Sequence, residues 1–231
     1  MMELLYTANC GVLLKGEKAA IGFDLLHEVQ APPFSKVPEE TFRYVLEKEK
    51  ADVLFYSHIH PDHFGEEMNR AYAEKYHPAY IMPEHPMATL PLAADHGSFE
   101  IKNLDLRVEY CRLLHSGDQY KDVINYGFLI EFEGKTILSL GDASLTAPEI
   151  PHFLSGKTVD LAFINFPFYT LSSGRDAICN IIKPKNVIIQ HLPFESDDRF
   201  AYRKAIEKRC YAPGMPPVLA LLTETLQKVN L

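Results

Sequence analysis

Short apolar runs alternate along the chain with longer amphipathic segments. Short apolar runs bounded by turn residues predict strands over Gly11–Leu14, Ala19–Leu25, Val53–Tyr56, Leu104–Leu114, Gly127–Glu133, Thr136–Leu140, Leu161–Phe166 and Val187–Gln190. Amphipathic segments predict helices over Glu39–Lys48, Asp62–Tyr76, Ser173–Ile182 and Asp197–Arg209. Hairpins combined with strand–helix alternation predict an α/β or α+β sandwich in which helices cover sheets.

Composition narrows the class of protein further. A chain of 231 residues with 47% hydrophobic residues is long enough for one well-buried domain, which we expect to span residues 1–231. A net charge of −8 argues against binding nucleic acid through a basic face. The longest apolar runs, such as Val218–Leu222, are far shorter than the roughly 20 residues that cross a bilayer. We therefore expect neither a nucleic-acid partner nor a membrane partner, and the oligomeric state stays open.

The four cysteines are Cys10, Cys111, Cys179 and Cys210, and no two of them form a C-x-x-C pair. Their number is ordinary for buried thiols in a reducing compartment. We therefore interpret them as core or surface thiols and expect a cytoplasmic protein.

The densest group of chemically active side chains follows the strand at Val53–Tyr56. It reads Ser-His-Ile-His-Pro-Asp-His over residues 57–63. In an extended chain His58 and His60 lie on one face, and Pro61 and Asp62 suit the start of a helix, where the chain turns His63 towards them. Three imidazoles and a carboxylate this close together favour a metal site over the alternative, a polar loop of solvated histidines.

Three more polar residues each follow an apolar strand. They are His115, Asp142 and His191. Ligands of open α/β sheets gather beyond the carboxyl ends of strands, so these residues are candidates for the same site. Each one taken alone is more often a capping or surface residue, and it is their occurrence together that supports a shared site.

The motif H-x-H-x-D-H at 58–63, His115 followed by Ser-Gly, Gly-Asp at 141–142, and the late His191 together resemble the metallo-β-lactamase superfamily of metal-dependent hydrolases. The compact branch of ascorbate-6-phosphate lactonase-like proteins is the most similar. The resemblance implies a four-layer αββα sandwich, with two facing mixed sheets covered by helices, as a single metallo-hydrolase domain. The opening Thr7–Gly11, which replaces the branch's Trp-Leu-Gly-His-type start, weakens any transfer of substrate identity.

The resemblance also implies the ligands of a dinuclear metal site. One metal is expected on His58, His60 and His115, and the other on Asp62, His63 and His191, with Asp142 as the bridge. Asp24 matches an early-strand aspartate of the family that orients a ligand histidine. Its alternative role is that of an ordinary strand-end aspartate.

A site of this kind supports hydrolysis. The expected reaction is hydrolysis of an ester, lactone or phosphodiester of a small, anionic substrate, for which two metals would activate water and Asp62 and Asp142 would be the catalytic carboxylates. Zinc is the expected metal, and manganese or iron also suit the ligands. An iron-dependent oxidoreductase and a non-catalytic metal-binding sensor remain as alternatives. His27 and Tyr169 are candidate substrate contacts at the rim of the site.

Overall fold

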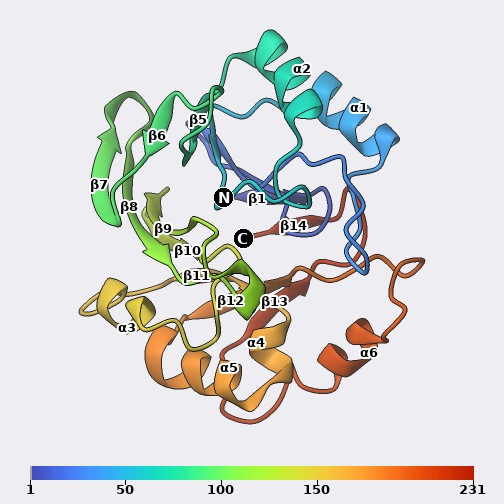
Figure 1. Ribbon diagram of the computed structural model, residues 1–231, viewed down its shortest axis with the longest axis vertical. Coiled ribbons are helices and arrows are strands. Elements are labelled where there is room, and N and C mark those ends of the chain that lie inside the picture. Colours follow the sequence, from blue (N-terminus) through green and yellow to red (C-terminus); the bar gives the residue numbers. More distant parts are fainter. Residues whose placement is uncertain (1) are drawn as a thin grey trace. The chain divides into compact units, whose positions relative to one another are not determined.

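The computed structural model describes residues 2–231 and divides into two compact units (Figure 1). The first unit comprises the described chain up to Ala93, together with His191–Phe200 and Leu222–Leu231. The second comprises Ala94–Gln190 and Ala201–Leu221. Each unit contains one seven-stranded sheet. Both units are assembled from separate stretches of sequence. The expected single domain of residues 1–231 stays a prediction.

The sheet of the first unit is mixed. Its strands, in spatial order, are β14 (Lys228–Asn230), β1 (Glu3–Tyr6), β2 (Val12–Lys15), β3 (Ala20–Phe23), β4 (Val53–Phe55), β5 (Ala79–Pro83) and β6 (Leu90–Leu92). Pairing is antiparallel from β14 to β3 and parallel from β3 to β6. Two helices belong to this unit, α1 (Glu39–Lys48) and α2 (Glu66–Tyr76).

The core of the first unit joins both helices to the sheet. Val45 of α1 and Tyr72 of α2 are fully buried in one cluster with Leu54 of β4. The Tyr72 hydroxyl accepts a hydrogen bond from the Ala51 amide (2.6 Å) and donates one to the Glu49 carbonyl (2.8 Å). These bonds satisfy the backbone between α1 and β4, so Tyr72 fixes the start of the strand that leads into the histidine motif.

The sheet of the second unit is also mixed. Its strands, in spatial order, are β13 (Val218–Leu221), β12 (Asn186–Gln190), β11 (Leu161–Asn165), β10 (Lys135–Ser139), β9 (Asn125–Phe132), β8 (Leu106–Leu113) and β7 (His96–Ile101). Pairing is antiparallel from β7 to β10 and parallel from β10 to β13.

Short helices connect the strands of the second unit. They are α3 (Glu149–Phe153), α4 (Pro167–Thr170), α5 (Ser172–Asp176), α6 (Tyr202–Glu207), and the 3₁₀ or π segments η1 (Lys102–Leu104), η2 (Asp118–Tyr120) and η3 (Ala177–Ile182). With helices and a mixed sheet in each unit, the predicted α/β class is confirmed.

Three of the predicted helices differ from those observed. The helix expected over Ser173–Ile182 is divided into α5 and the π segment η3. The helix expected from Asp62 begins only at Glu66, because the amides of His63 and Phe64 both donate to the His60 carbonyl and close a turn there. Gly65 then adopts extended backbone as the N-cap. The final helix, expected over Asp197–Arg209, is reduced to α6.

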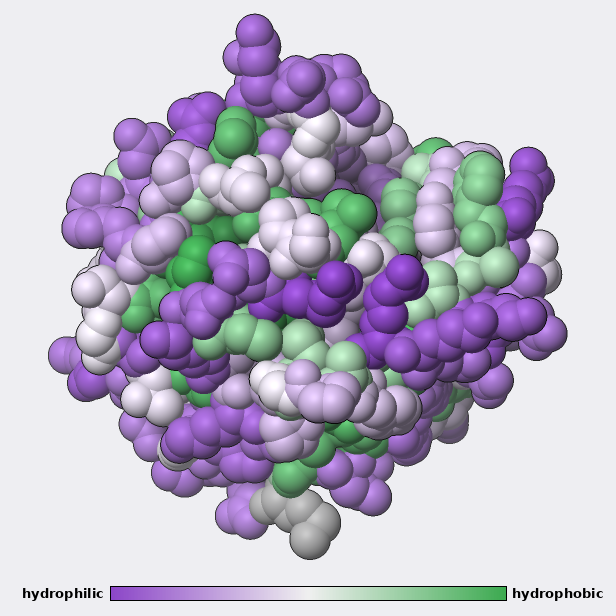
Figure 2. All heavy atoms as spheres, turned by 90° about the horizontal axis from the view of Figure 1, so that it is seen from below, coloured by the Kyte–Doolittle hydropathy of each residue, from purple (hydrophilic) through white to green (hydrophobic). Residues whose placement is uncertain are grey.

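Hydrophilic residues cover much of the face drawn in Figure 2, with smaller hydrophobic patches between them. Among residues 2–231, no helix combines the length and the apolar character that a membrane span requires.

Replacing Tyr72 by Phe tests the link between α1 and β4. The variant leaves the buried Ala51 amide without its acceptor, so we expect the free energy of unfolding to fall by about 1–3 kcal/mol. Urea denaturation measures the change, and Tyr211→Phe, at a side chain that is 73% exposed, is the control that should leave stability unchanged. Equal stability of the two variants would contradict this role of the hydroxyl.

Candidate functional site

The loop after β4 carries four of the predicted ligands in the first unit. His58 and His63 are fully buried, Asp62 is 9% exposed, and His60 is partly exposed. His58 Nε2 lies 3.1 Å from His60 Nδ1, and the His58 and His63 ring centroids are 4.1 Å apart. The chain therefore gathers three imidazoles within contact distance, as the alternation of side chains in an extended segment predicts.

Asp24, which follows β3, anchors the histidine loop through hydrogen bonds to Ser57 and His63. Its Oδ1 accepts from the Ser57 amide (2.8 Å), and its Oδ2 accepts from the Ser57 hydroxyl (2.8 Å) and from His63 Nδ1 (2.9 Å). The Ser57 hydroxyl in turn lies 2.9 Å from His58 Nδ1. Because β3 and β4 are parallel neighbours, their carboxyl ends bring Asp24 to the histidine loop.

This network selects one tautomer of two histidines. Ser57 Oγ uses its proton on Asp24, so it accepts from His58 Nδ1–H, and Asp24 accepts from His63 Nδ1–H. Both rings then carry their protons on Nδ1 and their lone pairs on Nε2, on the side away from the carboxylate. Metal-ligating histidines are commonly oriented in this way, so the residues fit a metal ion.

His191 follows β12 along the chain and belongs to the first unit. Its amide donates to the Asn9 carbonyl (2.9 Å), and its ring meets the edge of Phe34 at a centroid distance of 4.0 Å. The His63 ring lies 5.4 Å away, centroid to centroid. Asn9 also donates its Nδ2–H to the Asp62 carbonyl (2.8 Å) and carboxylate (3.3 Å). One residue thus links the histidine loop to His191.

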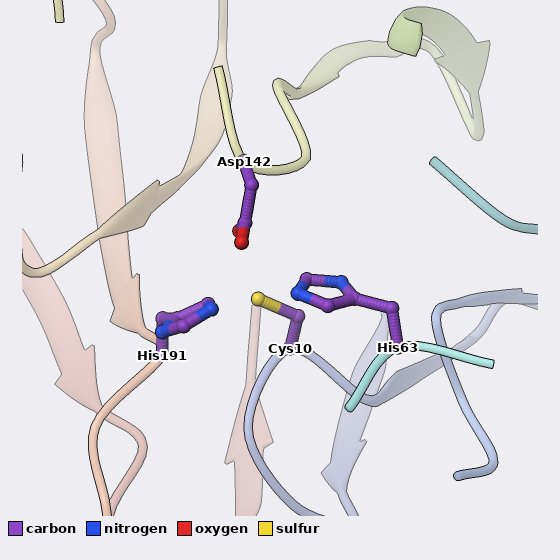
Figure 3. Close-up of side chains that lie close together, drawn as sticks. All are labelled: Cys10, His63, Asp142 and His191. Atoms are coloured by element: carbon purple, nitrogen blue, oxygen red, sulfur yellow. The ribbon is translucent and has the colours of Figure 1, made fainter. Parts of the chain in front are cut away.

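Cys10 is the residue of this group that the sequence interpretation missed. Its sulfur and one nitrogen each of His63 and His191 lie within 4.8 Å of one another, and the three side chains point towards a common point in Figure 3. Of the two positions expected for the cysteines, core or surface, Cys10 has the buried one, but its neighbours include imidazoles. No spacing motif connects Cys10 to residues 53 and 181 positions away, so sequence alone offered no signal.

The second unit holds the other two predicted ligands beside each other. His115 follows β8 and Asp142 follows β10, and His115 Nε2 lies 3.8 Å from Asp142 Oδ2. His115 Nδ1 donates to the Ser116 carbonyl (2.7 Å), which places its lone pair on Nε2. The Ser116 amide donates to the Asp142 carbonyl (2.8 Å), so backbone pairing holds the two loops together.

A chain of amides orients the Asp142 carboxylate. Gln190 Nε2 donates to Asn165 Oδ1 (3.1 Å), and Asn165 Nδ2 donates to Asp142 Oδ1 (2.8 Å). The Asn125 side chain accepts from the Asp142 amide (3.0 Å). Oδ1 is therefore engaged by Asn165, and Oδ2 is the oxygen nearer to His115.

The two candidate substrate contacts lie inside the protein. His27 and Tyr169 have no exposed surface, so neither stands on the exposed rim where the sequence interpretation put them. Burial lowers the pKa of His27 to about 4, which keeps its imidazole neutral at pH 7. Burial likewise raises the pKa of Tyr169. A fully buried group meets a substrate only if its neighbours move, and contact of these two residues with substrate stays a prediction.

Comparison with known proteins rests on structure alone. No family model matches the sequence, and no curated protein matches it. The structure is similar to that of Igni18, a metallo hydrolase from the archaeon Ignicoccus hospitalis, with a TM-score of 0.68, 15% identity, and coverage of 100% of this chain and 99% of that one. It is also similar to the metallo-β-lactamase fold protein YhfI from Bacillus subtilis, with a TM-score of 0.65, 16% identity and 98% of each chain covered.

A third similar structure is CmlA, a diiron β-hydroxylase from Streptomyces venezuelae. The TM-score is 0.59 at 15% identity. The match covers 100% of this chain and 54% of CmlA. Likeness over the full length of the chain, to structures that include a named member of the fold, agrees with the resemblance carried by the histidine and aspartate motifs. The chain therefore has the metallo-β-lactamase fold.

Proposed function

We propose that this protein is a metal-dependent hydrolase with a dinuclear centre. The observation that carries the proposal is the hydrogen-bonded group of Asp24, Ser57, His58 and His63, in which one carboxylate sets the tautomer of two clustered imidazoles. A buried arrangement of this kind has a clear use when metal ions bind the Nε2 atoms. The likeness to Igni18 supports the same class of activity.

The proposed ligand sets follow the sequence analysis. His58, His60 and His115 would hold one cation, Asp62, His63 and His191 would hold the other, and Asp142 would be a ligand of both. When bound, two divalent cations supply Lewis acidity and activate water near neutral pH. Asp24 and Ser57 keep His58 and His63 oriented, and Asn165 keeps Asp142 in place through Oδ1.

The charge of such a centre indicates the substrate class. Two divalent cations carry more positive charge than Asp62 and Asp142 neutralise, so the centre attracts anions although the whole chain has a net charge of −8. We therefore propose a small anionic ester, lactone or phosphodiester as the substrate. Zinc as the metal and a cytoplasmic location are further proposals from the sequence.

An iron-dependent oxidoreductase is the second candidate. The likeness to CmlA favours it, because CmlA is a diiron β-hydroxylase. Stoichiometric iron with a visible absorption band, together with oxygen uptake, supports this candidate, whereas zinc with hydrolytic turnover supports the first. Bound metal without turnover of any substrate would favour a metal-dependent sensor.

Replacing Asp142 by Ala tests the bridging carboxylate. We expect hydrolysis of a panel of phosphodiesters and lactones to fall by about two orders of magnitude or more, because a bridging ligand acts on both metals. Initial rates measure the effect, and circular dichroism checks the fold. Asp176→Asn, at an exposed carboxylate, is the control. Unchanged rates in Asp142→Ala would contradict a bridging role.

Replacing Asp24 by Asn tests the tautomer argument with almost no change of shape. The amide has one acceptor oxygen in place of two. Either its NH2 group faces His63 Nδ1 and the His63 tautomer changes, or its NH2 group faces the Ser57 amide and the histidine loop loses that anchor. We expect the affinity for zinc to fall by about 10–100-fold. Competition with a chromogenic chelator measures the affinity, again with Asp176→Asn as control. Wild-type affinity in Asp24→Asn would show that Asp24 does not orient a ligand.

A further inference from the structure

Cys10 is a sulfur donor that neither proposed ligand set includes. It lies on the loop between β1 and β2 and is 2% exposed. Its sulfur lies within 4.8 Å of one nitrogen each of His63 and His191 (Figure 3). A buried cysteine that only fills space is expected among apolar side chains. Here the sulfur meets two imidazoles that are proposed to ligate the same cation.

The loop that carries Cys10 is held at both ends. The Thr7 amide donates to the Gly11 carbonyl (2.8 Å), the Gly11 amide donates to the Ala8 carbonyl (2.6 Å), and the Thr7 hydroxyl donates to the Leu25 carbonyl (2.7 Å). A Cβ at position 11 would collide with Thr7 Oγ1 and lie 2.9 Å from the Leu25 carbonyl. Glycine at this position therefore permits the tight turn that presents Cys10.

The same loop is tied to both imidazole-bearing segments. Asn9, next to Cys10, donates to Asp62 and accepts from the His191 amide. Asn9 adopts a left-handed backbone conformation (φ 53°), which asparagine tolerates better than most residues. Cys10 is thus positioned by the contacts that position Asp62 and His191.

We propose that Cys10 is a thiolate ligand of the cation held by His63 and His191, an inference that rests on the proposed metal centre. Sulfur and nitrogen atoms bound to one zinc ion at angles near 109° lie about 3.3–3.6 Å apart, given Zn–S near 2.3 Å and Zn–N near 2.0–2.1 Å. The observed separations are all below 4.8 Å, so a contraction of at most about 1.5 Å suffices. On coordination the thiol releases its proton to solvent and the sulfur donates a lone pair to the metal.

A thiolate changes which metal the site prefers. Cysteine sulfur is a soft ligand that favours zinc over manganese or magnesium, for which carboxylate and water are better suited. Cys10 therefore makes this half of the centre selective for zinc or iron.

Cobalt substitution of the full-length protein tests the inference. We expect Co²⁺ to give a thiolate-to-metal charge-transfer band in the wild type and in the control Cys210→Ser, which alters another buried thiol. The band should be absent from Cys10→Ser and Cys10→Ala, and their zinc affinity should fall at least about tenfold, with a smaller change for manganese. A band of equal intensity in the two Cys10 variants that still bind cobalt would overturn the proposal.

X-ray absorption of the zinc-loaded wild type gives a second readout that requires no variant to fold. We expect a sulfur scatterer at about 2.3 Å, amounting to half a sulfur per zinc when both sites are filled. Bound zinc with nitrogen and oxygen scatterers alone would overturn the role of Cys10 but leave the metal centre standing. Failure of the wild type to bind zinc or cobalt at all would instead overturn the proposed function, and this inference with it.

Discussion

The contact between the Asp24 carboxylate and the Ser57–His63 loop is the constraint on which the proposed chemistry depends. Both carboxylate oxygens are used, three hydrogen bonds of 2.8–2.9 Å meet on one buried side chain, and each originates in the histidine loop. The carboxylate thereby fixes the backbone at Ser57 and the proton positions of His58 and His63. Imidazoles whose Nδ1 atoms are engaged in this way leave Nε2 for a metal, which distinguishes a metal site from a polar loop.

The same principle operates separately in each unit. The candidate ligands follow the ends of strands, and hydrogen bonds from neighbouring residues determine which of their atoms face a metal. In the first unit Asp24 and Asn9 have this role. In the second unit Ser116 and Asn165 orient His115 and Asp142. The orienting groups are amides, hydroxyls and carbonyls as well as carboxylates. No simple sequence motif predicts such a mixed set.

Local patterns predicted a large part of this structure, and long-range contacts account for what they missed. The helix Glu39–Lys48 agrees residue for residue with α1, where charge complements the helix dipole, and the strands before each candidate ligand are all present. The start of α2 was misplaced because a turn closed on the His60 carbonyl competes with helix initiation. Cys10 was missed because its neighbours are far apart in sequence and meet only in the folded unit. His27 and Tyr169 were placed at a rim because the sequence around a loop histidine or a tyrosine in a short helix does not reveal its burial.

The metal content of the purified wild-type protein tests the central claim most directly. Expression without affinity metals or chelators, followed by elemental analysis against protein concentration, gives the number of metal ions per chain. We expect two equivalents of a transition metal, mainly zinc, to remain bound to each chain after gel filtration. A protein that is folded, carries no metal, and takes up none from added Zn²⁺, Mn²⁺ or Fe²⁺ would contradict it.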